Sequence, residues 1–256
     1  MGRLQSAGKT HVGMKRVHNE DAMQIAEPLG LFCVADGMGG HSSGEVASAM
    51  AVSEISGFFE RTENDRDATW PYKEDRALNY DENRLVTAIK LANLRIYEAS
   101  TTDPKSRGMG TTIVAALFAP SQTVVAHVGD SRVYQFVQAE KKLVQLTEDH
   151  SLLNDYLRAK SLKPEEVANF PHKNVITRAL GIKDAVQVDV ARPRLAPGDI
   201  LLLCCDGLSG MVPELTMAQI LSEQADLDNA AGQLVDAANT AGGVDNITVI
   251  LVRWAP

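Results

Sequence analysis

Cysteine is scarce in this sequence, and no apolar run is long. The three cysteines, Cys33, Cys204 and Cys205, lie inside apolar runs, and two of them are adjacent. This usage excludes a disulfide framework and predicts buried free thiols in a reducing compartment, with the cytoplasm as the expected location. The longest apolar stretches, 111–119 and 200–205, fall well short of the roughly 20 residues that cross a bilayer. The N-terminus lacks the apolar centre of a signal peptide, so we expect no membrane partner.

Positive charge is also in short supply. Lysine and arginine total 25 against 33 aspartates and glutamates, which gives a net charge of −8. Nucleic acids and anionic membranes need a basic face, so this balance argues against both as partners. The sequence contains no HExxH and no CxxC motif. The usual signals of a zinc site are therefore missing.

The 256 residues alternate short strand-like runs with longer amphipathic segments. Predicted strands, rich in valine, isoleucine, leucine and phenylalanine, are 22–25, 30–35, 111–118, 123–128, 132–137, 200–204 and 246–252. Predicted helices are 44–59, 85–100, 151–160, 164–168, 213–222 and 227–240. Short connections after 111–118 and 132–137 predict antiparallel hairpins, and the helices follow one another in pairs. This pattern favours an α+β fold of layered sheets and helices.

A polar, charged stretch separates the first two predicted helices. Residues 60–84 are long for a helix–helix connection, which usually spans about 2–8 residues. Two interpretations stay open. The stretch is either a solvated excursion that caps the helix ends or a lid that is specific to a partner.

Aspartates stand at the ends of the apolar runs. Asp36, Asp130 and Asp206 each follow one, and Asp245 opens the last. If these strands share a core, the carboxylates converge, and burying them unpaired costs several kcal/mol each. Either the side chains reach solvent separately or cations lie among them. With Asp21 the set carries five negative charges, and oxygen ligands of this kind favour hard ions, Mg²⁺ or Mn²⁺.

The pair Asp-Gly is also a common signal of a hairpin turn. After Asp36-Gly37 and Asp206-Gly207 the chain leads into helical segments instead of a second strand, which argues against a turn at both places. At Asp130 predicted strands flank the motif, so a turn and a ligand are equally compatible with it. Asp245 is also compatible with an ordinary loop residue.

Six ordered motifs resemble those of a known family. They are Arg16-Val-His-Asn-Glu-Asp21, Val34-Ala-Asp-Gly-Met-Gly-Gly-His41, Gly110-Thr-Thr112, Val128-Gly-Asp-Ser-Arg132, Cys205-Asp-Gly-Leu208 and Gly243-Val-Asp-Asn246. The set is similar to the motifs of the metal-dependent protein phosphatases, the PPM or type 2C family, in its bacterial branch, and it spans residues 13–252 in family order. The resemblance implies a single PPM-type domain over residues 1–256, built as a four-layer αββα sandwich of two antiparallel sheets flanked by helix pairs. It also implies hydrolysis of phosphoserine and phosphothreonine in proteins.

The same resemblance implies two or three Mn²⁺ or Mg²⁺ ions and their ligands. The ligands of a first ion are Asp36, Asp206 and Asp245. Those of a second are Asp36 and the backbone carbonyl of Gly37, with Glu20 and Asp21 holding its waters. Asp130 with Asp206 resembles a weaker third site found in bacterial members. Two such cations bridging a water would lower the pKa of that water and direct a hydroxide in line at phosphorus.

The resemblance implies roles for further residues. Arg16 falls at the position of the family's phosphate-binding arginine, whose planar fork suits two phosphate oxygens. His41 either protonates the leaving alkoxide or orients water or substrate, although Met38 occupies the slot of the eukaryotic histidine. Residues 151–180 match the flap beside the cleft in bacterial relatives. We interpret His127 and His150 as structural histidines.

The implied partners are phosphorylated proteins, serine/threonine kinases or their substrates, and the expected state is a monomer. Two other functions stay open. Some domains of this fold act as scaffolds after losing metal ligands, which the intact aspartates argue against, and a small-molecule phosphatase is also compatible with the sequence. Metal-dependent hydrolysis of a phosphate ester tests the first alternative. Comparing phosphothreonine with phosphotyrosine peptides helps to test the second.

Overall fold

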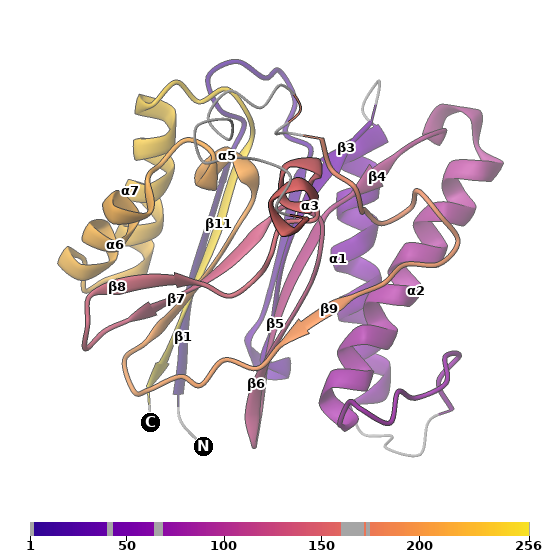
Figure 1. The fold of residues 1–256 in the computed structure, drawn as a ribbon, viewed down its shortest axis with the longest axis horizontal. Coiled ribbons are helices and arrows are strands. Elements are labelled where there is room, and N and C mark those ends of the chain that lie inside the picture. Colours follow the sequence, from indigo (N-terminus) through magenta and orange to yellow (C-terminus); the bar gives the residue numbers. More distant parts are fainter. Residues whose placement is uncertain (1–2, 40–42, 64–68, 160–171, 173–174, 256) are drawn as a thin grey trace.

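Two antiparallel sheets pack face to face, and helices cover both outer faces (Figure 1). The computed structural model describes residues 3–39, 43–63, 69–159, 172 and 175–255. The first sheet has the strand order β1 (Arg3–His11), β11 (Ile247–Ala255), β10 (Ile200–Cys204), β7 (Arg132–Val137) and β8 (Lys142–Gln145). The second has the order β2 (Asp21–Ala26), β3 (Leu31–Met38), β5 (Ile113–Ala119), β6 (Gln122–Val128) and β9 (Asp189–Ala191), with β4 (Gly110–Thr111) also paired to β3. The pairings among these strands are all antiparallel, including the two predicted hairpins.

The helices form the two outer layers (Figure 1). The second sheet is covered by α1 (Ser43–Thr62) and α2 (Tyr80–Thr102), and the first by α6 (Glu214–Glu223) and α7 (Leu227–Thr240). The short helical elements are α3 (Leu152–Arg158), α5 (Asp206–Ser209), η1 (Glu27–Leu29) and η2 (Pro104–Ser106). This order of layers confirms the predicted α+β class and the αββα sandwich. Within the described part of the chain, no helix is both long and apolar enough to span a membrane.

The central strands are apolar throughout because both of their faces are buried. In β3, the odd-numbered residues of 31–35 pack against the helices, and the even-numbered ones pack between the sheets. In β10, the even-numbered residues of 200–204 face α6 and α7, and the odd-numbered ones lie between the sheets. Successive side chains on a strand point to opposite faces, so a strand between two layers needs an unbroken apolar run. These are the runs that precede Asp36 and Asp206.

The elements that were not predicted include β1, β9 and α5. β1 is an edge strand of largely polar sequence, yet it pairs with β11 along its whole length. β9 has three residues and α5 has four, too few for a periodic signal. The helix predicted at 164–168 lies outside the described residues.

The polar stretch 60–84 contains the end of α1 and the beginning of α2. Asn79 forms a capping box at the start of α2: its side chain accepts from the Glu82 amide at 3.1 Å, and the Glu82 carboxylate accepts from the Asn79 amide at 2.9 Å. Trp70 packs its ring 6.1 Å from that of Phe58 in α1. In its described part, the stretch therefore packs against the ends of the two helices.

One edge of the sandwich gathers the elements that carry the predicted ligands. The C-terminal end of β3 and the helix α5 lie at the upper edge in Figure 1, opposite the chain termini. The loop into β2 lies against the end of β3, because the Gly37 amide donates to the Glu20 carbonyl oxygen at 3.1 Å. This edge is where the site is built.

Candidate metal centre

Asp21 and Asp36 face each other across the β2–β3 pair. They are directly opposed in the register, and such residues project to the same face of an antiparallel sheet. Asp36 lies inside β3 rather than at its end, because the strand continues to Met38 and pairs there with β4. The placement of Asp36 at a strand end was therefore wrong by two residues, and no hairpin turn occurs there.

Three further aspartates reach the same region from other segments. Asp206 begins α5 two residues after the end of β10, Asp245 precedes β11, and Asp130 lies between β6 and β7. Burial raises the pKa of Asp36 well above its usual value, and the charges of Asp21, Asp206, Asp130 and Asp245 raise it further. The fold thus brings together five carboxylates that are far apart along the chain.

These carboxylates are poorly solvated and repel one another. Burial raises the pKa of Asp21 and that of Asp130 to about 7, and the charge of Asp206 adds to both shifts. The pKa of Asp206 itself is raised by burial and then by Asp245. Buried Oδ1 atoms of Asp21 and Asp206 have no hydrogen-bond partner among the described residues. Buried carboxylate oxygens that lack a hydrogen-bond donor fit Mn²⁺ or Mg²⁺, because these ions prefer oxygen ligands.

A thiol lies beside these oxygens. Ligand atoms of Asp21, Asp36 and Cys205 are all within 4.8 Å of one another. Burial raises the pKa of the Cys205 thiol far above its usual value. Its Sγ accepts from the Thr248 amide at 3.1 Å and donates to the Asn246 carbonyl oxygen at 3.3 Å. A protonated thiol held in this way is a neighbour of the oxygen cluster and a poor ligand for a hard ion.

Gly37 occupies a position where a side chain does not fit. A Cβ at Gly37 would lie 2.2 Å from the Gly44 carbonyl oxygen and 2.5 Å from that of Glu20. A Cβ at Gly44 would in turn lie 2.9 Å from Oε1 of Glu20. The carboxylate of Glu20, the residue before Asp21, therefore lies against the first turn of α1.

Arg16 reaches the cluster from the loop before β2. Its Nη2 donates to Oδ2 of Asp245 at 2.7 Å, and its side chain is 49% exposed. The hydrogen bond to Asp245 raises the pKa of Arg16, and the charges of Glu20 and Asp36 add to this. A guanidinium carries five N–H donors, so the contact with Asp245 leaves others free to bind an anion.

Asn246 organises the loop that carries Arg16 and Glu20. Its Oδ1 accepts from the Glu20 amide at 2.8 Å, and its Nδ2 donates to the carbonyl oxygens of Val12 and His18, both at 2.9 Å. Asn246 ends the motif Gly243-Val-Asp-Asn246, and no role was predicted for it. The available signal was a polar side chain directly before an apolar strand.

Threonine hydroxyls and amides position the two opposed aspartates. Thr248 Oγ1 donates to Oδ2 of Asp21 at 2.6 Å. The Asp36 carbonyl oxygen accepts from the Thr112 amide at 2.9 Å and from Thr111 Oγ1 at 2.8 Å. These threonines were also missed as individual residues, although two of them belong to a quoted motif.

Two parts of the predicted site lie outside the described residues. They are His41 and, within the predicted flap 151–180, residues 160–171 and 173–174. The described part of that flap begins with α3, whose first turn is capped by Ser151: its Oγ accepts from the Asn154 amide at 3.3 Å. Ser151 also pairs with Ile176 in an isolated β-bridge.

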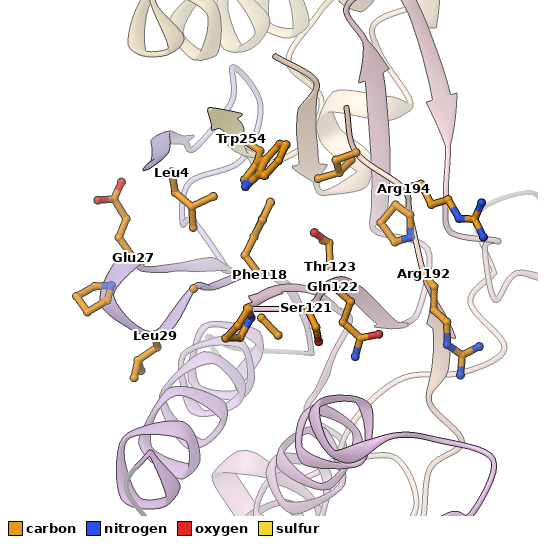
Figure 2. A pocket seen from close by; sticks show the side chains of 16 residues that line it. Leu4, Glu27, Leu29, Phe118, Ser121, Gln122, Thr123, Arg192, Arg194 and Trp254 are labelled. Carbon is orange, nitrogen blue, oxygen red and sulfur yellow. The ribbon is translucent and has the colours of Figure 1, made fainter. Parts of the chain in front are cut away.

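A cavity of about 1120 Å³ lies at the other end of the sandwich (Figure 2). Leu4, Phe118 and Trp254 lie side by side on its wall, and none of the five aspartates lines it. Gly30, which borders the cavity, precedes Asp36 by six residues, and this is about 20 Å of extended chain. The cavity is therefore separate from the carboxylate cluster.

The sequence matches a known family over most of its length. A family profile described as Protein phosphatase 2C matches residues 7–241. Serine/threonine phosphatase stp of Listeria monocytogenes serotype 4b (strain F2365) is 42% identical over 251 residues, which cover 96% of this chain and 94% of that protein.

Solved structures agree with the sequence comparison. The Mycobacterium tuberculosis serine/threonine phosphatase PstP/Ppp superposes with a TM-score of 0.84 at 30% identity, covering 100% of both chains. The catalytic domain of serine threonine protein phosphatase PstP in complex with 2 manganese ions superposes with a TM-score of 0.79 at 30% identity, covering 99% of both chains.

Proposed function

This chain belongs to the protein phosphatase 2C family, and we propose that its five-aspartate cluster is the active site. The protein is a metal-dependent serine/threonine phosphatase whose substrates are phosphorylated proteins. One observation carries the assignment of the site: Asp36 lies close enough to Asp21, Asp130, Asp206 and Asp245 that all four charges raise its pKa. Divalent cations relieve such repulsion.

We assign the oxygen atoms of the cluster as ligands of up to three ions. Asp36, Asp206 and Asp245 hold one ion. Asp36 and the carbonyl oxygen of Gly37 hold a second, with Glu20 and Asp21 orienting its waters. Asp130 with Asp206 holds a third. The unpartnered Oδ1 atoms of Asp21 and Asp206 support this arrangement, since each is a buried acceptor without a donor. When bound, Mn²⁺ or Mg²⁺ supplies neutralisation of phosphoryl charge and a water of lowered pKa for attack on phosphorus.

Arg16 is proposed as the phosphate-binding residue. It is held at the cluster by Asp245, and it is half exposed, so its remaining N–H groups are accessible to a phosphoryl oxygen. A planar guanidinium binds two such oxygens at once. His41 stays a prediction for protonating the leaving serine or threonine alkoxide or for orienting water or substrate.

Further proposals concern the extent of the domain, its oligomeric state, its substrates and its location. The chain is proposed to form one phosphatase domain over residues 1–256, to act as a monomer, and to dephosphorylate serine/threonine kinases or their substrates. It is proposed to work in the cytoplasm. The free and buried Cys33, Cys204 and Cys205 support a reducing compartment.

A matched pair of variants tests the active site. We expect wild-type protein to release phosphate from a phosphothreonine peptide only when Mn²⁺ or Mg²⁺ is present, and Asp206→Asn to abolish this. Asp228→Asn removes an equally charged side chain that is 65% exposed and bound to Lys9, and it should leave turnover unchanged. Full activity of Asp206→Asn would refute the site. A wild-type preference for a phosphotyrosine peptide or a small phosphate ester would favour the small-molecule alternative.

A further inference from the structure

His150 binds both backbone groups of the residue that precedes Asp130. The Gly129 amide donates to Nδ1 of His150 at 3.0 Å, and the His150 amide donates to the Gly129 carbonyl oxygen at 2.9 Å. The His150 side chain is only 4% exposed. Gly129 has a φ of 110°, and a Cβ there would lie 2.6 Å from Cβ of Thr112. The backbone that aims the Asp130 carboxylate is therefore fixed from two sides, by His150 and by Thr112.

The ring of His150 is itself held in one orientation. Because Nδ1 accepts a hydrogen bond, the proton of the neutral ring lies on Nε2, which donates to Oδ2 of Asp189 at 3.1 Å. Arg178 Nη1 donates to the other oxygen of Asp189 at 2.8 Å. Burial lowers the pKa of His150, which favours this neutral form. The His127 ring stacks on that of His150 with centroids 4.6 Å apart.

This group does not leave room for a metal ion. Ligand atoms of His127, His150 and Asp189 lie within 4.8 Å of one another. Arg178 Nη1 approaches Nε2 of His150 to 2.9 Å and Oδ1 of Asp189 to 2.8 Å. A guanidinium thus already occupies the position of a cation, so the group acts through the hydrogen bonds of His150.

His150 also connects the Asp130 loop to a distant segment. Its carbonyl oxygen accepts from the Thr177 amide at 2.8 Å, and the neighbouring Leu152 amide donates to the Val175 carbonyl oxygen at 2.8 Å. One residue therefore joins Gly129, β9 and the segment 175–178. A side chain interpreted as structural therefore contacts the residue next to a proposed ligand.

We propose that His150 is a positioning residue for the phosphatase reaction, which sets the Asp130 carboxylate for a divalent ion through its hydrogen bond to the Gly129 amide. The proposal rests on the proposed function, because it requires Asp130 to bind an ion. It predicts that the contact at Nδ1 matters for ion affinity and that the contact at Nε2 matters less.

Two variants separate these contacts. In His150→Asn, Oδ1 lies near the position of Nδ1 and can accept from the Gly129 amide, whereas His150→Gln offers its amide near the position of Nε2. We expect His150→Gln to raise the Mn²⁺ concentration for half-maximal activity about tenfold, since the buried Gly129 N–H loses its acceptor, with kcat restored at saturating Mn²⁺.

For His150→Asn, the Mn²⁺ concentration for half-maximal activity should stay near the wild-type value. His127→Gln, which disturbs the stacked ring but not Gly129, should also stay near it. Calorimetric titration of each variant with Mn²⁺ alone should give the same order.

A double-mutant cycle tests whether His150 acts through Asp130. In an Asp130→Ala background, His150→Gln should cause no additional weakening of Mn²⁺ binding. The proposal would be overturned if His150→Gln lowered the Mn²⁺ affinity of Asp130→Ala by the same factor as that of the wild type. It would also be overturned if His150→Asn and His150→Gln lowered the Mn²⁺ affinity equally. If His150→Gln does not fold, His150→Leu, which also offers no acceptor to the Gly129 amide, should weaken Mn²⁺ binding in an otherwise wild-type chain and not in Asp130→Ala, and the absence of that effect would also overturn it. Failure of the proposed function is distinct, because wild-type protein would then show no Mn²⁺ dependence at all.

Discussion

Replacing Asp130 by asparagine should stabilise the metal-free protein at alkaline pH. Burial, with the nearby charge of Asp206, raises the pKa of Asp130 from 3.8 to about 7. The Asp130 carboxyl group therefore binds its proton more tightly in the folded state than in the unfolded state. The contribution of Asp130 to the free energy of unfolding is therefore highest below about pH 4, falls as the pH rises toward 7, and stays low above it. A shift of about three pKa units corresponds to at most about 4 kcal/mol.

Asparagine has a similar shape and does not ionise, so it avoids this loss. In EDTA at pH 8, we expect Asp130→Asn to exceed wild type by about 2–4 kcal/mol in the free energy of unfolding, or roughly 5–10 °C in Tm. At pH 4.5 the difference should be much smaller, because the wild-type carboxyl is largely protonated when folded. Thermal unfolding followed by circular dichroism at the two pH values measures both differences.

The exposed Asp228→Asn variant serves as the control, since its carboxylate is bound to Lys9 at the surface and should show no gain that grows with pH. With Mn²⁺ present, the advantage of Asp130→Asn should shrink, because the wild-type carboxylate gains an ion. A raised pKa of Asp130 is refuted if Asp130→Asn in EDTA is no more stable than wild type at pH 8, or if its gain is the same at both pH values.

Three other substitutions probe separate features. Arg16→Lys keeps the charge and loses the planar fork, so kcat/KM for a phosphothreonine peptide should fall about tenfold or more, and an unchanged value would contradict its role. Asn246→Ala removes three hydrogen bonds that hold the loop before β2; urea unfolding should show a loss of about 2–4 kcal/mol, and a loss below about 0.5 kcal/mol would show that the loop does not need them. Gly37→Ala places a Cβ 2.2 Å from the Gly44 carbonyl oxygen, and we expect no cooperative unfolding transition; a wild-type Tm would be inconsistent with that packing.

The strands buried on both faces were the most predictable part of the fold. β10 has the predicted bounds, because a strand between two apolar layers consists of consecutive apolar residues. β7 also has the predicted bounds, although it contains Arg132 and Gln135 and is only partly buried. β1 was missed because its stability comes from pairing with β11, near the other end of the chain. Its own residues carry little of that information.

The aspartates of the site could be predicted from the sequence, but the residues whose hydrogen bonds position them could not. Asp36 and Asp206 interrupt apolar runs, and a charge in that place is a local signal. The hydrogen bond from Asn246 to Val12 joins residues 234 positions apart, and that between Gly129 and His150 joins residues 21 apart. Such pairs follow from the three-dimensional arrangement of the loops, which no local pattern encodes.

The central claim is that Asp36, Asp206 and Asp245 bind a common divalent ion. Anomalous diffraction at the manganese absorption edge, from crystals grown in Mn²⁺, tests it most directly. We predict a strong anomalous peak within coordination distance of carboxylate oxygens from all three residues. Ordered crystals with saturating Mn²⁺ whose manganese peaks touch none or only one of these carboxylates would contradict the account.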